Sequence, residues 1–200
     1  MNERHRTAKP RRPYRLQKRA ESQEATRLRI TEAMLELHAS IGPARTTVTE
    51  VARRAGVQRL TVYRNFPDEL SMLTACSGLH AERYPVPDPE PLTAISDPDE
   101  RLRAGLGAIY AYFRRHQDVL RNIFRDAEVM PNVKLVLRHR QERVGRLADV
   151  LLEGRQGSPA LVAAIRHAIA FPTWDSLCGR GRLSDEDAID LMAAMVRGAA

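Results

Sequence analysis

Residues 46–66 read TTVTEVARRAGVQRLTVYRNF, and this stretch predicts two short helices joined by a tight turn. Thr47 is placed to cap the first helix, and Glu50 stands three residues later, where a capping box needs it. The first helix is predicted to run through Ala55. Gly56 then supplies the turn, because glycine adopts the backbone conformations of tight turns without steric cost.

Both predicted helices have an apolar face and a polar face. The residues expected to be buried are Val48, Val51, Ala52, Ala55, Val57, Val62 and Phe66. The side chains expected to point outward from the second helix are Gln58, Arg59, Thr61, Tyr63, Arg64 and Asn65. A short helix with such a polar face suits the major groove of DNA, so the pattern favours a helix-turn-helix. The alternative is an ordinary helical hairpin with a polar surface.

The start of the chain is strongly basic. The protein has 32 Lys and Arg residues against 25 Asp and Glu, a formal net charge of +7. The cations of residues 1–19 are Arg4, Arg6, Lys9, Arg11, Arg12, Arg15, Lys18 and Arg19, opposed only by Glu3. We expect residues 1–21 to form a disordered basic arm that neutralises DNA phosphates. A solvated tail without a partner is the alternative.

The rest of the chain is predicted to be helical, because no segment shows sustained two-residue alternation of apolar residues. Apolar spacing predicts a helix from Ser22 to Ile41, and another opens after Pro67. Five prolines within residues 84–99 predict a loop, since proline does not continue a helix. The further helices are expected at about Pro98–His116, Val119–Glu128, Asn132–Leu152, Pro159–Ser176 with a bend at Pro172, and Asp185–Arg197.

These predictions describe an all-α protein with an N-terminal three-helix helix-turn-helix DNA-binding domain and a C-terminal helical ligand-binding and dimerisation domain. The expected boundaries are residues 22–84 for the DNA-binding domain with its connecting helix, 85–98 for the proline-rich loop and 99–200 for the C-terminal domain.

The segment Thr46–Leu73 resembles the DNA-binding domain of the TetR family of transcription regulators. The resemblance rests on the pattern T-T-V-x-x-V-A-x-x-A-G-V followed by T-V-Y-R-x-F-P. It implies that Thr47 and Tyr63 contact phosphates and that Arg59 and Thr61 approach base edges. It also implies a homodimer on a pseudo-palindromic operator, acting as a repressor that an unidentified small-molecule effector releases.

The chain departs from the family pattern at three positions. Gln58 stands where the family often has a serine, Leu60 where glycine is frequent, and Glu69 where a lysine is common. Leu60 is therefore expected to contact thymine methyl groups. The predicted set of DNA-contacting residues is Thr47, Gln58, Arg59, Leu60, Thr61, Tyr63, Arg64 and Asn65.

The C-terminal half has no comparable motif, so its expectations rest on residue type. The large side chains available to line a ligand cavity are Tyr110, Phe113, Phe124, Met130 and Trp174, of which Tyr110, Phe113, Phe124 and Trp174 form the predicted ligand-binding set. His116 and His167 are weaker polar candidates. The apolar stripes suited to a dimer interface are Leu161, Ile165 and Ile169, and Ala188, Leu191, Met192, Met195 and Val196. Core packing within one subunit is the alternative for both sets.

Other function classes find little support in the sequence. It has no phosphate-binding loop, no catalytic constellation and no metal-ligand spacing, so we expect neither an enzyme nor a cofactor. A redox sensor built on Cys76 and Cys178 is one alternative, and non-specific nucleic-acid binding through the basic arm is the stronger one. With no secretory signal and no membrane-spanning segment, the protein is expected in the cytoplasm, associated with the nucleoid.

Overall fold

We describe the protein from a computed structural model, which covers residues 11–199 and the side chains from residue 16 onward. The expected all-α fold is confirmed, since these residues form helices and no strand. The helices are α1 (Arg11–Ser40), η1 (Pro43–Arg45), α2 (Val48–Ala55), α3 (Arg59–Asn65), α4 (Glu69–Arg83), η2 (Glu90–Ala94), α5 (Pro98–Ala127), α6 (Pro131–Leu152), α7 (Pro159–Ala168), α8 (Phe171–Trp174), η3 (Asp175–Arg180) and α9 (Asp185–Gly198). No helix in residues 11–199 has the length and apolar character needed to cross a membrane.

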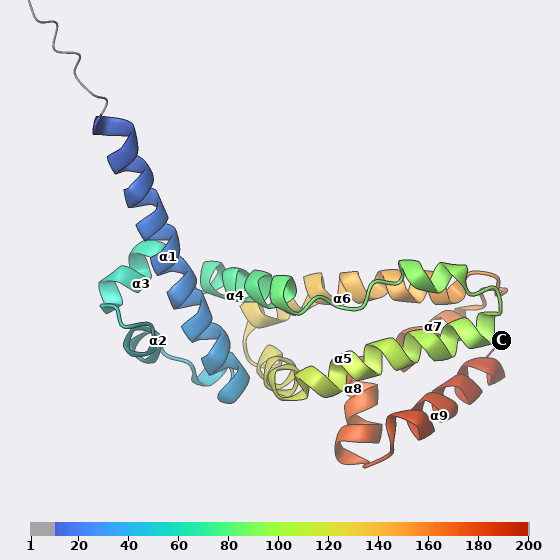
Figure 1. Cartoon of the computed structure of the whole chain (residues 1–200). Coiled ribbons are helices and arrows are strands. Elements are labelled where there is room, and N and C mark those ends of the chain that lie inside the picture. Colours follow the sequence, from blue (N-terminus) through green and yellow to red (C-terminus); the bar gives the residue numbers. More distant parts are fainter. Residues whose placement is uncertain (1–10, 200) are drawn as a thin grey trace, which may run out of the picture.

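Helix α1 begins at Arg11, so residues 11–21, which we expected to be disordered, are helical instead. Pro13 lies in the first turn, where a missing backbone N–H costs nothing. The residues after it are mostly good helix formers, which extends the helix without an apolar stripe. The first part of α1 is exposed and projects beyond the other helices (Figure 1). The remainder of the predicted arm, residues 1–10, lies outside the described residues.

Helices α1 to α4 enclose a small core. The buried residues of this cluster are Ile30, Ala33, Met34, Leu37, Val51, Ala52, Ala55, Val62, Phe66 and Cys76. Val48 and Val57 are half-buried and pack against it. The burial predicted for the stretch 46–66 is therefore confirmed, and it holds α2 and α3 against α1.

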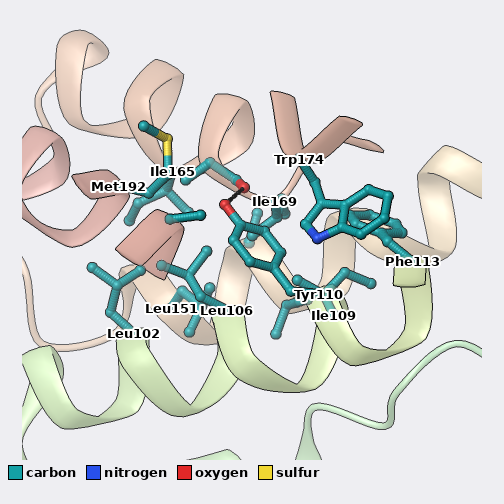
Figure 2. Packing of buried hydrophobic residues seen from close by; sticks show 14 of the residues in the cluster. Leu102, Leu106, Ile109, Tyr110, Phe113, Leu151, Ile165, Ile169, Trp174 and Met192 are labelled. Atoms are coloured by element: carbon teal, nitrogen blue, oxygen red, sulfur yellow. Dashed lines mark hydrogen bonds between the residues drawn. The ribbon is translucent and has the colours of Figure 1, made fainter. Parts of the chain in front are cut away.

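Helix α5 lies between α6 and α9 (Figure 1). The sequence predicted two helices here, Pro98–His116 and Val119–Glu128, and the 30-residue α5 is indeed interrupted by a kink at His116, whose φ of −115° and ψ of 15° are not helical. Its inner face carries the largest core, drawn in Figure 2, where Tyr110 and Phe113 lie among aliphatic side chains and Trp174.

The predicted helix Pro159–Ser176 is broken rather than bent. Helix α7 ends at Ala168, Ala170 is extended, and Pro172 lies in the first turn of α8. Proline cannot donate a hydrogen bond to the carbonyl of Ala168, so a continuous helix would leave that oxygen unpaired. The hydroxyl of Tyr110 donates to this carbonyl instead, at 2.9 Å (Figure 2). A π-helix, η3, follows at Asp175–Arg180.

The turn after α1 is bound to the end of α5, and we call this contact the α1–α5 junction. The amide of Asn122 donates to the carbonyls of His38 and Ala39, and Asp126 accepts from the N–H of Ala44 at 2.9 Å. Gly42, with φ of +92°, lies under Arg125 and Asp126, where any Cβ would overlap them. Helices α1 to α3 are thereby tied to the C-terminal helices by polar contacts.

Candidate DNA-binding site

The start of α2 is capped by Thr47, as predicted. Its hydroxyl oxygen accepts from the N–H of Glu50 at 3.2 Å. The reciprocal half of the predicted capping box does not form, because the Glu50 carboxylate instead binds the guanidinium of Arg53 at 3.0 and 2.5 Å. A complete capping box occurs at the start of α4, between Asp68 and Ser71.

The turn between α2 and α3 matches the sequence prediction. Gly56 has the left-handed conformation, with φ of 65° and ψ of 37°, and its N–H bonds to the carbonyls of Ala52 and Arg53. Gln58 then takes the N-cap position of α3 with an extended backbone, and its side chain makes no capping hydrogen bond. The Gln58 side chain is therefore available for other partners.

Helix α3 presents an outward surface built from the predicted residues. Gln58, Arg59 and Arg64 are exposed, as are Leu60 at 56% and Tyr63 at 45%, while Thr61 and Asn65 are half-buried. Thr47, at the start of α2, is exposed as well. Within residues 11–199, Arg59 and Arg64 form neither an ion pair nor a side-chain hydrogen bond, so both guanidinium groups are free to bind an external acceptor.

Asn65 differs from the other predicted contacts. Its side-chain N–H donates to the carbonyl of Thr61 at 2.8 Å, and its own backbone carbonyl accepts from Arg27 at 2.5 Å. The Arg27 guanidinium also lies over the ring of Phe66, 4.1 Å from its centroid. Arg27 thus holds the end of α3 against α1, a role that sequence reasoning missed because 38 positions separate it from Asn65.

Glu69 is the departure from the family pattern for which the structure gives a contact. Its carboxylate accepts from the side-chain amide of Asn132, at 2.7 Å. Because Glu69 begins α4 and Asn132 lies in the first turn of α6, this hydrogen bond links the helix that follows α3 to the C-terminal helices.

Residues 30–76 match the sequence profile of the family described as "Bacterial regulatory proteins, tetR family". This region of the chain is therefore similar to the DNA-binding region of the TetR family. The matched residues include α2 and α3 with the Gly56 turn, so the resemblance carried by the sequence motif is confirmed. No curated protein sequence matches the chain.

Solved structures of TetR-family regulators have the same fold over most of the chain. The repressor NalD of Pseudomonas aeruginosa is 24% identical, with a TM-score of 0.61 over 89% of this chain and 97% of NalD. A Streptomyces coelicolor regulator is 20% identical, with a TM-score of 0.60 over 88% and 79% of the two chains. A Marinobacter aquaeolei regulator is 19% identical, with a TM-score of 0.59 over 90% and 97%. The fold shared with these structures thus extends to the C-terminal helices.

The predicted ligand-binding residues fall into two groups. Phe113 and Phe124 line a cavity of about 670 Å³ between α5, α6 and α8. Tyr110 and Trp174 are fully buried in the core, and their polar atoms are already bound, the Trp174 indole N–H to Asp185 at 2.9 Å. The structure thus places only the two phenylalanines where a ligand can reach them.

The predicted dimer stripes are mostly core in the single chain. The buried members are Leu161, Ile165, Ile169, Ala188, Met192 and Val196. Leu191 is 46% exposed on α9, and Met195 is half-buried. Leu191 is therefore the one exposed member of the two predicted stripes.

Both cysteines are buried, which disfavours the redox-sensor alternative. Burial raises the pKa of the Cys76 thiol to about 12 and is the main cause that raises the pKa of Cys178 to about 11. The Cys76 sulfur lies 3.3 Å from the Nδ1 atom of His38. A sensor thiol needs exposure and an ionised form near neutral pH, and neither thiol has them.

Proposed function

We propose that this protein is a sequence-specific transcription regulator that binds a pseudo-palindromic operator as a homodimer and that a small-molecule effector releases. The observation that carries the proposal is the outward surface of α3, where Arg59 and Arg64 stand exposed and unpaired on a helix fixed from behind. A buried face of Val62 and Phe66 fixes α3, so its surface is preorganised for a major groove.

The proposed contacts follow from the chemistry of the exposed side chains. Arg59 near the start of α3 has the planar fork that binds the O6 and N7 atoms of guanine. Leu60 and Thr61 beside it suit a thymine methyl and a base edge. Thr47 and Tyr63 are proposed to bind phosphates through their hydroxyls.

Further contacts come from residues at the margin of this surface. Gln58 and Arg64 supply free donors for bases or phosphates. Asn65 belongs to the proposed interface through its remaining amide acceptor, because its donor is engaged with Thr61.

We propose that residues 22–84 bind DNA and residues 99–200 bind the effector, with residues 85–98 as the loop between them. The cavity of about 670 Å³ has the size and apolar lining of a small-molecule site. Helix α4 connects α3 to this region and packs on α6, so a ligand beside α6 can act on the position of α3. Repression is proposed in keeping with NalD, which is a repressor.

A homodimer is proposed because two recognition helices one DNA turn apart bind a pseudo-palindrome that one alone would hold weakly. The exposed Leu191 on α9 marks the proposed interface. Sedimentation of the wild type and Leu191→Arg at the same concentration tests it. We expect a dimer for the wild type and a shift towards monomer for the variant.

The DNA-binding proposal is tested by selecting fragments from a genomic library at near-physiological salt. Wild type, Arg59→Ala and Tyr63→Phe are compared with Arg103→Ala, a matched control whose exposed guanidinium lies on α5 and pairs with Asp190. We expect one enriched pseudo-palindrome, weakened or altered by Arg59→Ala and unchanged by Arg103→Ala. Uniform binding that neither α3 variant changes would instead assign DNA binding to the basic residues at the start of the chain.

A further inference from the structure

Arg140 of α6 is an arginine without a carboxylate partner in the interior of the protein. It is half-buried between α4, α5 and α6. One of its N–H groups lies 3.4 Å from the Nδ1 atom of His80, and another donates to the hydroxyl of Tyr112. Within residues 11–199 no Asp or Glu oxygen comes within salt-bridge distance of it. Its two side-chain partners are both uncharged groups.

The surroundings of Arg140 supply no anion, although its guanidinium lies over the Tyr112 ring, 5.6 Å from the centroid. Burial, helped by the neighbouring Arg140, lowers the pKa of His80 to about 4, so the imidazole is neutral near neutral pH. Burial also lowers the pKa of Arg140 to about 10, which still leaves it protonated. His116 lies over Tyr112, with ring centroids 4.7 Å apart, and brings no negative charge. A buried cation without an anion is costly, so such a group is usually kept for a partner.

Arg140 stands where three cavities meet. It lines cavities of about 340, 670 and 50 Å³. Tyr112 and Val86 also line both of the larger ones. The largest cavity has apolar walls that include Leu120, Phe113, Phe124, Ile169 and Phe171. The arrangement therefore combines a polar corner at Arg140 with an extended apolar wall.

The charged residues at the rim of these cavities are mostly basic. Besides Arg140, the lining includes Arg138, Arg143, Arg146 and Arg166, against the carboxylates of Glu142 and Asp149. The excess of arginine over carboxylate favours an anion over a cation or a neutral molecule in the same space.

We propose that the effector is an amphipathic anion whose carboxylate or phosphate head binds Arg140 and Tyr112, and whose apolar body lies along Phe113 and Phe124. This assignment rests on the proposed effector cavity and names the class of ligand that fills it. The guanidinium offers a charge-assisted fork that matches either head group, and the Tyr112 hydroxyl adds a donor beside it. An uncharged analogue of the same shape leaves the guanidinium unpaired.

The same contact connects the proposed anion site to the helices proposed to bind DNA. His80 belongs to α4, so its contact with Arg140 joins α4 to α6. A head group that takes the donors of Arg140 competes with His80 for them. The anion thereby removes one link between α4 and α6, while the Glu69–Asn132 hydrogen bond remains at the start of α4. Effector binding and the position of α4 are coupled through Arg140.

Calorimetric titration of the full chain in the absence of DNA tests the proposal. The probes are decanoate, decyl phosphate and decanol, and naphthoate with naphthol as a rigid pair, each below its micelle-forming concentration. We expect an acid or phosphate to bind at least about tenfold more tightly than its matched alcohol, in line with a charge-assisted hydrogen bond. Arg140→Gln should abolish this preference, and Lys134→Gln, which removes an exposed cation of the same helix that lines none of the three cavities, should retain it.

Equal binding of acid and alcohol, no binding of any anionic probe, or an unchanged preference in Arg140→Gln would overturn the proposal. Binding of the phosphate alone, or of the carboxylate alone, supports it and identifies the head group. Arg140→Leu supplies a second measurement without ligand. Removal of an uncompensated charge should keep or raise the melting temperature, whereas a purely structural arginine would lower it. Because no DNA is present, failure here is separate from failure of operator binding.

Discussion

The two arginines of α3 differ from Arg114 and Arg121 of α5 in what they contact. Arg59 and Arg64 on α3 are exposed and have no ion-pair partner within residues 11–199. In the C-terminal half, Arg114 binds Asp185 through two hydrogen bonds of 2.7 Å, and Arg121 binds Asp175 at 2.7 Å. One set is kept free at the surface, and the other joins helices to one another.

This difference gives a way to separate binding residues from structural ones in a basic protein. An arginine that holds the fold has its acceptors within the chain, a carboxylate for Arg114 and a backbone carbonyl for Arg27, and its loss leaves them unpaired. An arginine that binds a ligand has no internal carboxylate, so its loss changes affinity and leaves stability intact. Arg140 is in the C-terminal half but has the uncompensated charge of a binding residue.

The largest expected effect is a loss of stability when the α1–α5 junction is disrupted. Asp126 is 2% exposed and accepts from the N–H of Ala44 and from Arg125. Asp126→Ala leaves both donors without their acceptor, so we expect the free energy of unfolding to fall by about 3 kcal/mol. Urea unfolding followed by the fluorescence of Trp174 measures this change. Asp118→Ala is the control, because its carboxylate is exposed and pairs with Arg121 only at 3.8 Å. An equal loss of stability in Asp118→Ala would contradict a specific role for Asp126.

The next largest effect is a dependence of stability on pH, and it concerns His38 at the α1–α5 junction. Burial lowers the pKa of His38 from 6.5 to about 4, although the nearby Asp126 acts to raise it. The unfolded chain therefore binds a proton between these pH values that the folded chain does not. We expect the free energy of unfolding to decrease as the pH falls through this window, by about 2 to 3 kcal/mol in total.

Urea unfolding at a series of pH values checks the His38 prediction. His38→Gln should make the curve less steep between pH 6.5 and 4, the window set by the pKa of His38, and the slope that remains comes from His80, whose pKa is also lowered to about 4. His139→Gln, which removes an exposed imidazole from α6, is the matched control and should keep the wild-type slope. Identical slopes for all three proteins would show that His38 is not held in its neutral form.

A smaller effect on stability compares Arg114, which is paired within the chain, with Arg59, which is not. Arg114→Ala removes both hydrogen bonds to Asp185, which is then held only from the side of Trp174. Because the pair is partly exposed, we expect a loss of only about 1 kcal/mol in the free energy of unfolding. Arg59→Ala should change it by less than about 0.5 kcal/mol. If Arg59→Ala is the more destabilising of the two, the proposed difference between the sets is wrong.

The smallest effect concerns Arg64. If Arg64 binds a phosphate, it contributes charge to DNA binding but makes no base-specific contact. Arg64→Ala should then weaken binding to all DNA sequences alike. The slope of log affinity against log salt should fall by about one unit. Fluorescence anisotropy with operator and unrelated duplexes over a salt series measures both. A loss confined to the operator would instead place Arg64 at a base edge.

The helix-turn-helix was predictable because its determinants are local. The cap at Thr47, the turn at Gly56 and the apolar spacing from Val51 to Phe66 all act within a few residues of one another. The break after α7 was not predictable, since it depends on a hydroxyl from Tyr110 that lies 58 positions from Ala168. The start of α1 was missed because helix propensity, without an apolar face, continues the helix.

The candidate ligand-binding residues show more clearly how far the sequence alone can predict a site. Large aromatic residues occur both in cores and in cavities, and the sequence does not distinguish Phe113 from Trp174. Arg140 was overlooked because its partners His80 and Tyr112 come from two other helices, 60 and 28 positions away. Its lack of a carboxylate partner is a property of the folded chain alone.

Gly42 has a consequence for how this protein tolerates mutation. Its φ of +92° and the side chains of Arg125 and Asp126 above it exclude every residue that has a Cβ. Gly56, with φ of +65° and open space around it, accepts asparagine at modest cost. A saturation library selected for folded protein should therefore return only glycine at position 42.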